Sequence, residues 1–476
     1  MLGLFGTLNL GARSLQAQQQ AVEVTGQNLA NVNNPAYARQ RVLIQTSPAI
    51  DTTIGPQGTG ADVVAIQQLR DTLVDRQITS ETSVGGYWNA QQSALQDAQS
   101  SLGEQLGNSA TGTGATSSSS AAGTPQGLST DLGNLFNAFQ SLSAAPSSMT
   151  ERQLVVNQAQ TLATDLNQTS QQLTNLRGLL NNSITSDAAS ANQLLTGIAS
   201  LNQQITTAEA STGGVANDLR DLRQQKLESL AKLVNVDAST APDGSLNVSI
   251  GGHLLVSGQQ TLDTLQTYDA GVGQVLVRAA TSGAALTITG GSIGGNIDAH
   301  DGALAATQTS LNTLAGQLIS AVNTAHSAGY SLTGSTGAAF FSGTDAASIQ
   351  VNSALVANPE LIQAAGPSGA AGDNQTALAL AQLANTKIAG LNNQTFSDSY
   401  NQSVAQLGQS LATANTQVSD QQAVQTMLQN QRNSVSGVSI DEEMTNLVSF
   451  QRAYEASAKL VNTVDQMLTT VINMKQ

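Results

Sequence analysis

The sequence predicts a mainly α-helical protein with an inserted β domain. Helical spacing of apolar residues extends over most of the chain, whereas strict apolar–polar alternation begins only after residue 236. Helical patterns lie on both sides of that alternating stretch, so both halves of the chain would build one central helical bundle. The predicted architecture is therefore nested: terminal coiled-coil helices together, then the central helical bundle, then a small outer β domain.

Both ends of the chain carry apolar residues at seven-residue intervals, which is the spacing of coiled-coil seams. The N-terminal series is Leu8, Leu15, Val22 and Leu29. The C-terminal segment carries two interleaved series, Leu447, Tyr454, Val461 and Leu468 with Phe450, Ser457, Val464 and Val471. We expect these assembly-seam residues to pack against the other terminus or against neighbouring molecules, the alternative being an ordinary intradomain core.

The N-terminal helix is predicted over residues 2–32, where four glycines each lower helix stability by up to about 1 kcal/mol relative to alanine. It ends before Pro35, because the residue preceding a proline disfavours helical backbone angles. Short runs of β-branched residues, together with turn residues, predict an extended segment or a hairpin at 40–68. A second helix is expected over 69–106, followed by a low-complexity Gly/Ser/Thr/Ala loop at 107–127.

Two or three long helices are expected over residues 128–235. The pattern then changes, because Leu246, Val248 and Ile250 alternate with polar residues. Gly251-Gly252 supplies a turn before Leu254 and Val256, which together give the pattern of a β-hairpin.

Further strands are predicted at 275–277 and 286–288. Helix is expected to resume at 296–328, loop and short strand to occupy 330–375, and helix to continue from 376 to the C-terminus.

These patterns divide the chain into three predicted units. The terminal coiled-coil assembly domain comprises residues 1–60 and 430–476, the helical domain comprises 61–235 and 296–429, and the outer β domain comprises 236–295.

Composition excludes several classes of function. Only 10% of the residues are charged, the net charge is −15 and no basic run occurs, so neither nucleic acid nor an anionic membrane is an expected partner. The absence of cysteine excludes disulfides, thiolate metal sites and cysteine nucleophiles. An aromatic content of 3% argues against one large, close-packed enzyme core. Neither a cleavable secretory signal nor a membrane-spanning apolar run is predicted.

The chemically reactive side chains form no recognisable site. His253, His300 and His326 are far apart and lack metal-ligand spacing. The glycine-rich runs at 55–60 and 290–295 lack the features of phosphate or dinucleotide loops and are predicted to be turns. We therefore expect no catalytic residue, no metal and no cofactor.

Two charged clusters have ordinary structural interpretations. Asp441-Glu442-Glu443 is predicted to begin a helix, where carboxylates interact favourably with the positive end of the helix dipole. Asp218, Arg220, Asp221 and Arg223 alternate in charge along a helix and are expected to form surface ion pairs of small energetic value.

The segment from Ala30 to Gln40 resembles a signature near the N-terminus of bacterial flagellar rod, hook and hook-associated axial proteins. That family usually shows Asn-Val-Asn-Thr-Pro-Gly-Tyr-Ser-Arg-Gln. The matching residues of this chain are Asn31, Val32, Asn33, Pro35, Tyr37, Arg39 and Gln40. This chain departs from the pattern at Asn34, Ala36 and Ala38. These departures affect the expected geometry of the turn after the proline and leave the rest of the motif intact.

Four further stretches resemble the hook-associated protein 1 family, which forms the first hook–filament junction. They are residues 128–152, 217–223, 325–341 and 437–454. The resemblance implies a structural subunit that the flagellar type III apparatus exports unfolded, and that forms a junction ring in the extracellular flagellum. It also implies terminal helices in an inner layer and β domains that project outward.

The same resemblance implies a set of partners. These are copies of the chain itself in a ring, the hook protein, the second hook–filament junction protein, and an export chaperone that binds the C-terminal helix. No nucleic acid or membrane partner is implied.

Three alternatives remain open at this level. The chain could be another axial protein, either the second junction protein or a hook or rod subunit. A secreted enzyme would need a metal or nucleophile cluster within 236–295, a stretch with one histidine and neither cysteine nor glutamate. An adhesive role of the outer β domain would require binding to host surfaces.

We predict that the terminal segments, about 1–60 and 430–476, are the least ordered parts of the isolated monomer. The glycine-diluted N-terminal helix and the two apolar seams gain burial only through packing, so they are marginal by themselves. Brief proteolysis of the monomer should trim both ends and leave a resistant middle. Hydrogen exchange that protects both ends as strongly as the central helices would contradict this expectation.

Overall fold

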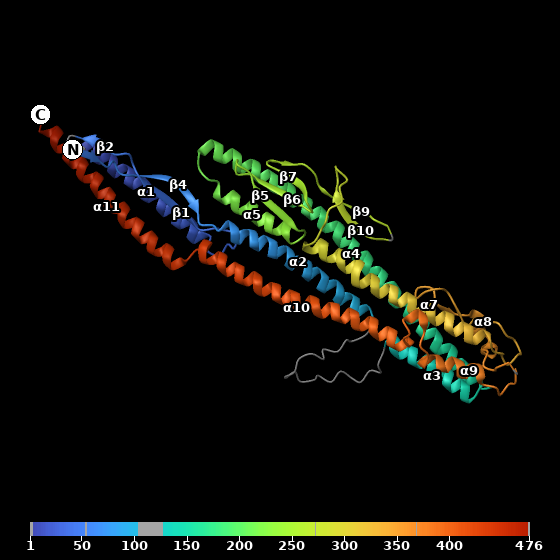
Figure 1. Ribbon diagram of the computed structural model, residues 1–476. Coiled ribbons are helices and arrows are strands. Elements are labelled where there is room, and N and C mark those ends of the chain that lie inside the picture. Colours follow the sequence, from blue (N-terminus) through green and yellow to red (C-terminus); the bar gives the residue numbers. More distant parts are fainter. Residues whose placement is uncertain (1–2, 53–54, 103–126, 272, 368, 475–476) are drawn as a thin grey trace.

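Long helices aligned into an elongated rod dominate the molecule, and both termini lie at one end of the rod (Figure 1). The structure is a computed structural model, and it describes residues 3–52, 55–102, 127–271, 273–367 and 369–474. The low-complexity loop predicted at 107–127 lies outside the described residues except for Gly127. The mainly α class with small antiparallel sheets is confirmed.

The two terminal helices pack against each other in antiparallel directions. They are α1 (Leu4–Ala30) and α11 (Ile440–Asn473). A Cβ added at Gly11 would lie 2.7 Å from Val461 Cγ2, and the Ser14 and Ser457 hydroxyls are 2.7 Å apart. Early residues of α1 therefore contact late residues of α11. We call this pair the terminal hairpin, and it confirms the predicted packing of the terminal helices on each other.

A two-stranded ribbon lies against α1 and accounts for the predicted extended segment. It consists of β1 (Gln40–Thr46) and β4 (Ala61–Gln68), joined through the short pair β2 (Ile50–Thr52) and β3 (Gly55–Gln57). The register runs from Gln40 opposite Gln68 to Thr46 opposite Ala61, with a bulge at Leu43/Ile44. The ribbon returns the chain to the base of the terminal hairpin, where the helical body begins.

The helical body is built from both halves of the chain. Its helices are α2 (Thr72–Ser101), α3 (Leu128–Ala144), α4 (Met149–Thr212), α5 (Asn217–Ala231), α7 (Ala305–Ser327), α9 (Gln375–Gln382) and α10 (Phe396–Ser436). The α2 and α10 helices run antiparallel, with Gln92 bonded to Asn415 at 2.7 Å and Gln421 to the Glu81 carbonyl at 2.8 Å. Both continue the axis of the terminal hairpin (Figure 1).

Short elements close the far end of the body. They are β11 (Phe341–Ser342), β12 (Gln350–Val351), α8 (Ser353–Ala357) and the 3₁₀ helices η2 (Pro359–Leu361), η3 (Leu383–Asn385) and η4 (Ala389–Leu391). Among the described residues, no helix has the length and apolar character needed to cross a membrane.

The prediction of one helix from residue 376 to the C-terminus is wrong. The helix is interrupted after α9, where Asn392 and Asn393 adopt left-handed backbone angles and Ile388 bridges to Gln394. It then restarts at Thr395, whose hydroxyl caps α10 by accepting from the Asp398 amide at 3.1 Å. A second interruption at residues 437–439 separates α10 from α11. At the first interruption, local hydrogen bonds rather than a proline stop and restart the helix.

The β unit lies beside α4 and α5 (Figure 1). One sheet has the order β5 (Val236–Thr240), β6 (Leu246–Ile250), β7 (His253–Ser257) and β8 (Gln260–Thr261), and a separate pair joins β9 (Leu265–Asp269) to β10 (Val275–Ala279). The predicted hairpin is confirmed. The predicted strand at 286–288 is wrong, since only Ala285 forms a bridge, to Arg278. That segment instead leads directly into the next helix.

A tight glycine turn joins the β unit to the rod. It opens α6 (Gly291–Asp298), which continues through the π-helix η1 (Ala299–Leu304) into α7, so helix resumes five residues before the predicted start at 296. Gly291 has a φ of +68°, and a Cβ there would collide with the backbone of Leu233 and Val234. Only glycine combines that backbone angle with such a close approach.

His326 is a packing residue in the core of the helical body. Its ring is fully buried, with Nδ1 2.8 Å from the Ala338 carbonyl while Nε2 accepts from the Gln363 amide at 2.9 Å. This arrangement requires the neutral imidazole that carries its proton on Nδ1. Burial lowers the pKa of His326 to about 4.

We predict that His326 makes the helical body sensitive to acid. The unfolded chain binds a proton at this side chain below about pH 6.5, and the folded chain only below about pH 4. Between these values the unfolded state binds more protons, so stability is lost as the pH falls. The full loss is about 3 kcal/mol.

The test is chemical denaturation at a series of pH values. H326Q removes the titrating ring and should give a shallower pH dependence between 6.5 and 4, although the variant is less stable at pH 7. An identical slope for both proteins would contradict the assignment.

Candidate functional site

The assembly-seam residues on α1 flank the most buried face of that helix. Leu8, Leu15, Val22 and Leu29 are each half-buried. The face that turns furthest inward is formed mainly by small and polar residues, Gly11, Ala17, Ala21, Val24, Thr25 and Asn28. At Gly11 the absence of a side chain allows Val461 of α11 to approach closely, while the four larger seam side chains remain partly exposed.

The seam residues on α11 divide into buried and exposed groups. Val464 is buried, and Leu447, Phe450, Val461 and Leu468 are half-buried. By contrast, Tyr454 and Val471 are exposed, at 42% and 55%. The α1 helix therefore covers only part of the apolar surface of α11.

Further exposed apolar side chains extend along α11. Near its start, Ile440, Met444 and Val448 recur every four residues. Near its end, Leu460, Met467 and Met474 accompany Val471 at helical spacing. At 100° per residue these two groups lie on opposite sides of the face that contacts α1. We call them the two apolar flanks of α11, and they leave the terminal hairpin with an incompletely covered surface.

Asn28 is the centre of a buried hydrogen-bond network at the base of the terminal hairpin. Its Nδ2 donates to the Gln40 carbonyl at 2.8 Å and to Glu443 Oε2 at 3.1 Å. Its Oδ1 accepts from the Gln40 amide at 2.9 Å and from the Tyr37 hydroxyl at 2.9 Å. One side chain thus joins α1, the following loop, β1 and α11. Sequence reasoning missed Asn28, which precedes the recognised signature.

Arg39 completes this network with two carboxylates from the first turn of α11. Its Nε lies 2.7 Å from Glu443 Oε1, and its Nη1 lies 2.6 Å from Glu442 Oε2. Glu443 is 2% exposed, so its charge is balanced in a largely desolvated position. The predicted helix start at Asp441-Glu442-Glu443 is confirmed, since all three residues lie in the first turn of α11. The ion pairs with Arg39 could not be seen in the sequence.

The signature also contacts the start of α5. Gln40 Nε2 donates to Asp218 Oδ1 at 3.0 Å, and the Ala38 amide donates to Asp221 Oδ2 at 3.2 Å. Asn217 Nδ2 lies 3.3 Å from Gln40 Oε1. Two sequence motifs that are separated by about 180 residues therefore form one joint.

The expectation of small-value surface pairs at Asp218–Arg223 is wrong. Asp221 and Arg223 are buried, at 5% and 8% exposed. Arg223 donates to Asn202 Oδ1 at 2.8 Å and to the Gly244 carbonyl at 2.9 Å, which ties α5 to α4 and to the β unit. Burial raises the pKa of Asp221 to about 6, although Arg70 lies 3.3 Å away. The alternating charges bond to other elements because α5 is covered on several sides.

The remaining signature residues shape the turn after α1. Asn31 ends the helix, and its side chain donates to the Gln27 carbonyl at 3.0 Å. Val32 and Asn33 continue the turn. The Pro35 carbonyl accepts from Arg432 Nη2 at 3.3 Å, which connects the turn to α10. Burial, followed by the nearby Asp218, raises the pKa of the Tyr37 hydroxyl, which therefore stays protonated as a hydrogen-bond donor.

Comparison with known proteins identifies the group to which this arrangement belongs. Residues 118–341 match the helical domain of the flagellar hook-associated protein FlgK, and residues 423–474 match the C-terminal region of flagellar basal body rod FlgEFG proteins. The chain is 28% identical to flagellar hook-associated protein 1 of Bacillus subtilis over 99% of both chains. It is 23% identical to flagellar hook-associated protein 1 of Escherichia coli over 98% of this chain and 99% of that protein.

The chain belongs to the flagellar hook-associated protein 1 family. It shares its fold with the flagellar hook junction protein FlgK from Burkholderia pseudomallei, with a TM-score of 0.63 at 17% identity over 76% of this chain and all of that one. As a member of this family it is a structural subunit of the extracellular flagellum at the hook–filament junction, and it is not an enzyme.

The β unit of this family member holds a Ser/His/Asp grouping whose geometry differs from that of a catalytic triad. Ser282 Oγ lies 3.3 Å and Asp263 Oδ2 lies 3.5 Å from the same ring nitrogen, His253 Nε2. A triad needs the carboxylate on one nitrogen and the hydroxyl on the other. Asp263 also accepts hydrogen bonds from the backbone N–H groups of Thr281 and Ser282. The grouping therefore stabilises a turn. In the described part of the chain, no three potential metal ligands converge.

We predict that Asn28 holds the terminal hairpin together more strongly than its size suggests. N28L leaves the Gln40 amide, the Tyr37 hydroxyl and one Glu443 oxygen without a partner in a buried site. The free energy of opening the hairpin should fall by about 2–4 kcal/mol. Hydrogen exchange of α1 and α11 amides measures this change.

N31L is the matched control for this experiment. Among the described residues, the Asn31 side chain bonds to Gln27 and Asn34 of the same turn, so its loss should alter exchange mainly at the end of α1. Equal acceleration of α11 exchange in both variants would contradict the central role of Asn28.

Proposed function

We propose that the terminal hairpin is the assembly element of this junction subunit. In this proposal it packs against copies of the same chain in a ring, with the hook protein on one side and the second hook–filament junction protein on the other. The observation that carries the proposal is the pair of apolar flanks of α11, which α1 leaves uncovered. Contiguous apolar surface of this kind favours protein–protein contact.

The energetics support assembly through these flanks. Fully burying one valine or methionine side chain contributes about 1.5–3 kcal/mol relative to leaving it exposed. Met467, Val471 and Met474 are 49%, 55% and 82% exposed in the single chain, so much of that gain is still available. Because the flanks lie on two sides of the α1 contact, at least two neighbouring helices can be accommodated around one α11.

The proposal extends to the domain order. Residues 1–60 and 430–476 form the inner assembly unit, residues 61–235 and 296–429 form the surrounding helical unit, and residues 236–295 form the outer β unit. In support, the termini lie at one end of the rod and the β strands lie beside α4, away from the terminal hairpin (Figure 1).

An export chaperone is the remaining partner in the proposal. Exposed apolar surface promotes aggregation before assembly. The α11 helix carries both flanks, so a chaperone that covers this helix would protect the same side chains that later contact neighbours.

We predict that M467D and V471D fold as monomers but fail to join hook to filament. Both side chains face solvent in the single chain, so the introduced carboxylates cost little there. In the assembled state each carboxylate would be buried without a partner, at a cost of several kcal/mol. Cells carrying either variant should make hooks, lack filaments and release filament subunits into the medium.

Q466D is the matched control, because it adds one carboxylate at an exposed polar position on the same helix turn. It should support normal filaments. Normal filaments with M467D and V471D would contradict the proposed role of the flank. A large drop in their monomer melting temperature would instead place these side chains in an intramolecular core.

A further inference from the structure

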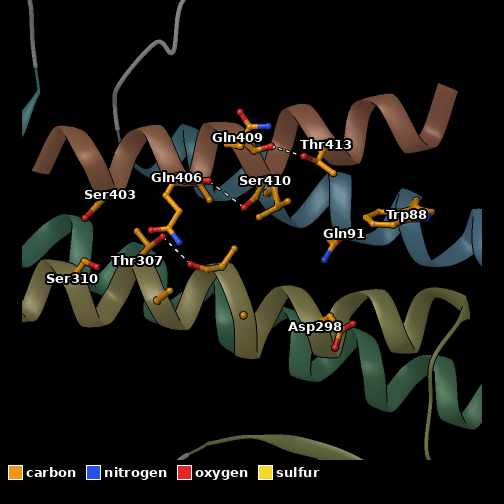
Figure 2. Close-up of a pocket in the computed structure, with 15 residues that line it drawn as sticks. Trp88, Gln91, Asp298, Thr307, Ser310, Ser403, Gln406, Gln409, Ser410 and Thr413 are labelled. Atoms are coloured by element: carbon orange, nitrogen blue, oxygen red, sulfur yellow. Dashed lines mark hydrogen bonds between the residues drawn. The ribbon is translucent and has the colours of Figure 1, made fainter. Parts of the chain in front are cut away.

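A polar cleft lies in the middle of the rod, far from the terminal hairpin. It is bounded by α2, by the segment from η1 into α7, and by α10 (Figure 2). Its volume is about 400 Å³, which falls within the range of small-molecule binding sites. The joint at the base of the hairpin contributes no residue to it, so the assembly role leaves the cleft unexplained.

The floor of the cleft is open because of the π-helix and its small residues. Gly302 and Ala303 of η1 and Ala306 of α7 line it. A Cβ added at Gly302 would meet no atom within 4 Å, so the backbone there faces free space. π-Helical segments are rare and are frequently found at functional sites. Here the segment lies where the rod helix leaves the β unit.

Uncharged hydrogen-bonding side chains alternate with apolar ones along the walls. The side chains of Gln91 on α2 and Gln406 on α10 point into the cleft (Figure 2). Thr307 and Ser410 donate to carbonyls of their own helices at 2.8 and 3.1 Å, which leaves their oxygens free to accept. Within the described part of the chain, the Gln406 side-chain amide bonds to no other residue. The cleft therefore presents both donors and acceptors.

The charge of the lining restricts the ligand. Among the described residues that line it, Asp298 alone is charged, and it accepts from the Tyr87 hydroxyl at 2.7 Å. The part of the chain that the structure describes places no lysine or arginine in the lining, so a phosphate, a carboxylate or an acidic peptide finds no countercharge among these residues. A neutral polyhydroxylated molecule matches this lining.

The only tryptophan of the chain forms one end of the cleft. Trp88 is half-buried and packs edge-on against Tyr87, with ring centroids 4.9 Å apart. Aromatic rings of this kind combine a large apolar surface with a fixed orientation. A pyranose ring presents apolar C–H groups on its face and hydroxyls around its rim, so one ring can contact the indole and the neighbouring Gln91 amide together.

We propose that this cleft binds a neutral saccharide. The C–H face of one pyranose packs against Trp88, and its hydroxyls donate to Asp298 and exchange hydrogen bonds with the Gln91 amide group. A second, linked pyranose reaches the Gln406 amide group farther along the cleft. The small floor residues leave room for the ring. This site is independent of ring assembly, and it gives the junction subunit a surface for glycans outside the cell.

The single tryptophan makes the test direct, because its fluorescence reports on the cleft alone. The full-length monomer is titrated with N,N′-diacetylchitobiose, cellobiose and lactose up to millimolar concentration. At least one of these neutral disaccharides should change Trp88 emission saturably, whereas a heparin disaccharide should not. Q406A should weaken the binding about fivefold, the effect of losing one or two neutral hydrogen bonds.

Q422A is the matched control, because Gln422 is exposed on α10 and lies outside the cleft. It should bind as the parent chain does. W88F, followed by calorimetry, should lose most of the affinity while its helix content stays unchanged. No saturable change with any neutral disaccharide, equal weakening in Q406A and Q422A, or preferential binding of the heparin disaccharide would each overturn the proposal.

Discussion

The buried network around Asn28, Arg39 and Glu443 is the interaction on which the rest of the molecule depends. It fixes the first helix, the ribbon and the last helix at one point, where the chain passes from the terminal hairpin into the body. Because Glu443 is 2% exposed, the loss of either partner leaves a desolvated charge. The direction of the hairpin relative to the rod is therefore set by a few polar groups and not by a large apolar core.

That construction suits a subunit whose terminal helices must remain available for neighbours. The body has its own extensive apolar core, contributed by helices from both halves of the chain. The hairpin buries only part of its apolar surface, because several large apolar side chains of α11 remain exposed. With only 10% charged residues, the chain can approach copies of itself without desolvating many charges. Stability and assembly are thus assigned to different parts of one rod.

The signature residues show which parts of the structure can be predicted from neighbouring residues in the sequence. The sequence indicated the turn at Pro35 and the acidic start of the last helix, since both depend on neighbouring residues alone. It gave no indication that Arg39 pairs with Glu443 across 404 positions, or that Gln40 contacts Asp218. Asn28 looked like one more polar residue of a helix, because nothing local distinguishes a buried asparagine from an exposed one. The charged residues of α5 were misjudged for the same reason, since their burial depends on elements distant in sequence.

Periodicity by itself determined the helical class, the inserted β unit and the return of both termini to one end, because apolar spacing follows directly from helix and strand geometry. The heptad spacing also marked the terminal helices as partners. The tertiary structure decided which face of α11 its partner covers and which flanks stay exposed, because the glycine and alanine face of α1 sets the closest approach. It also placed the cleft beside Trp88. The walls of this cleft come from α2, from the helical segment that runs from α6 into α7, and from α10, which lie far apart in the sequence.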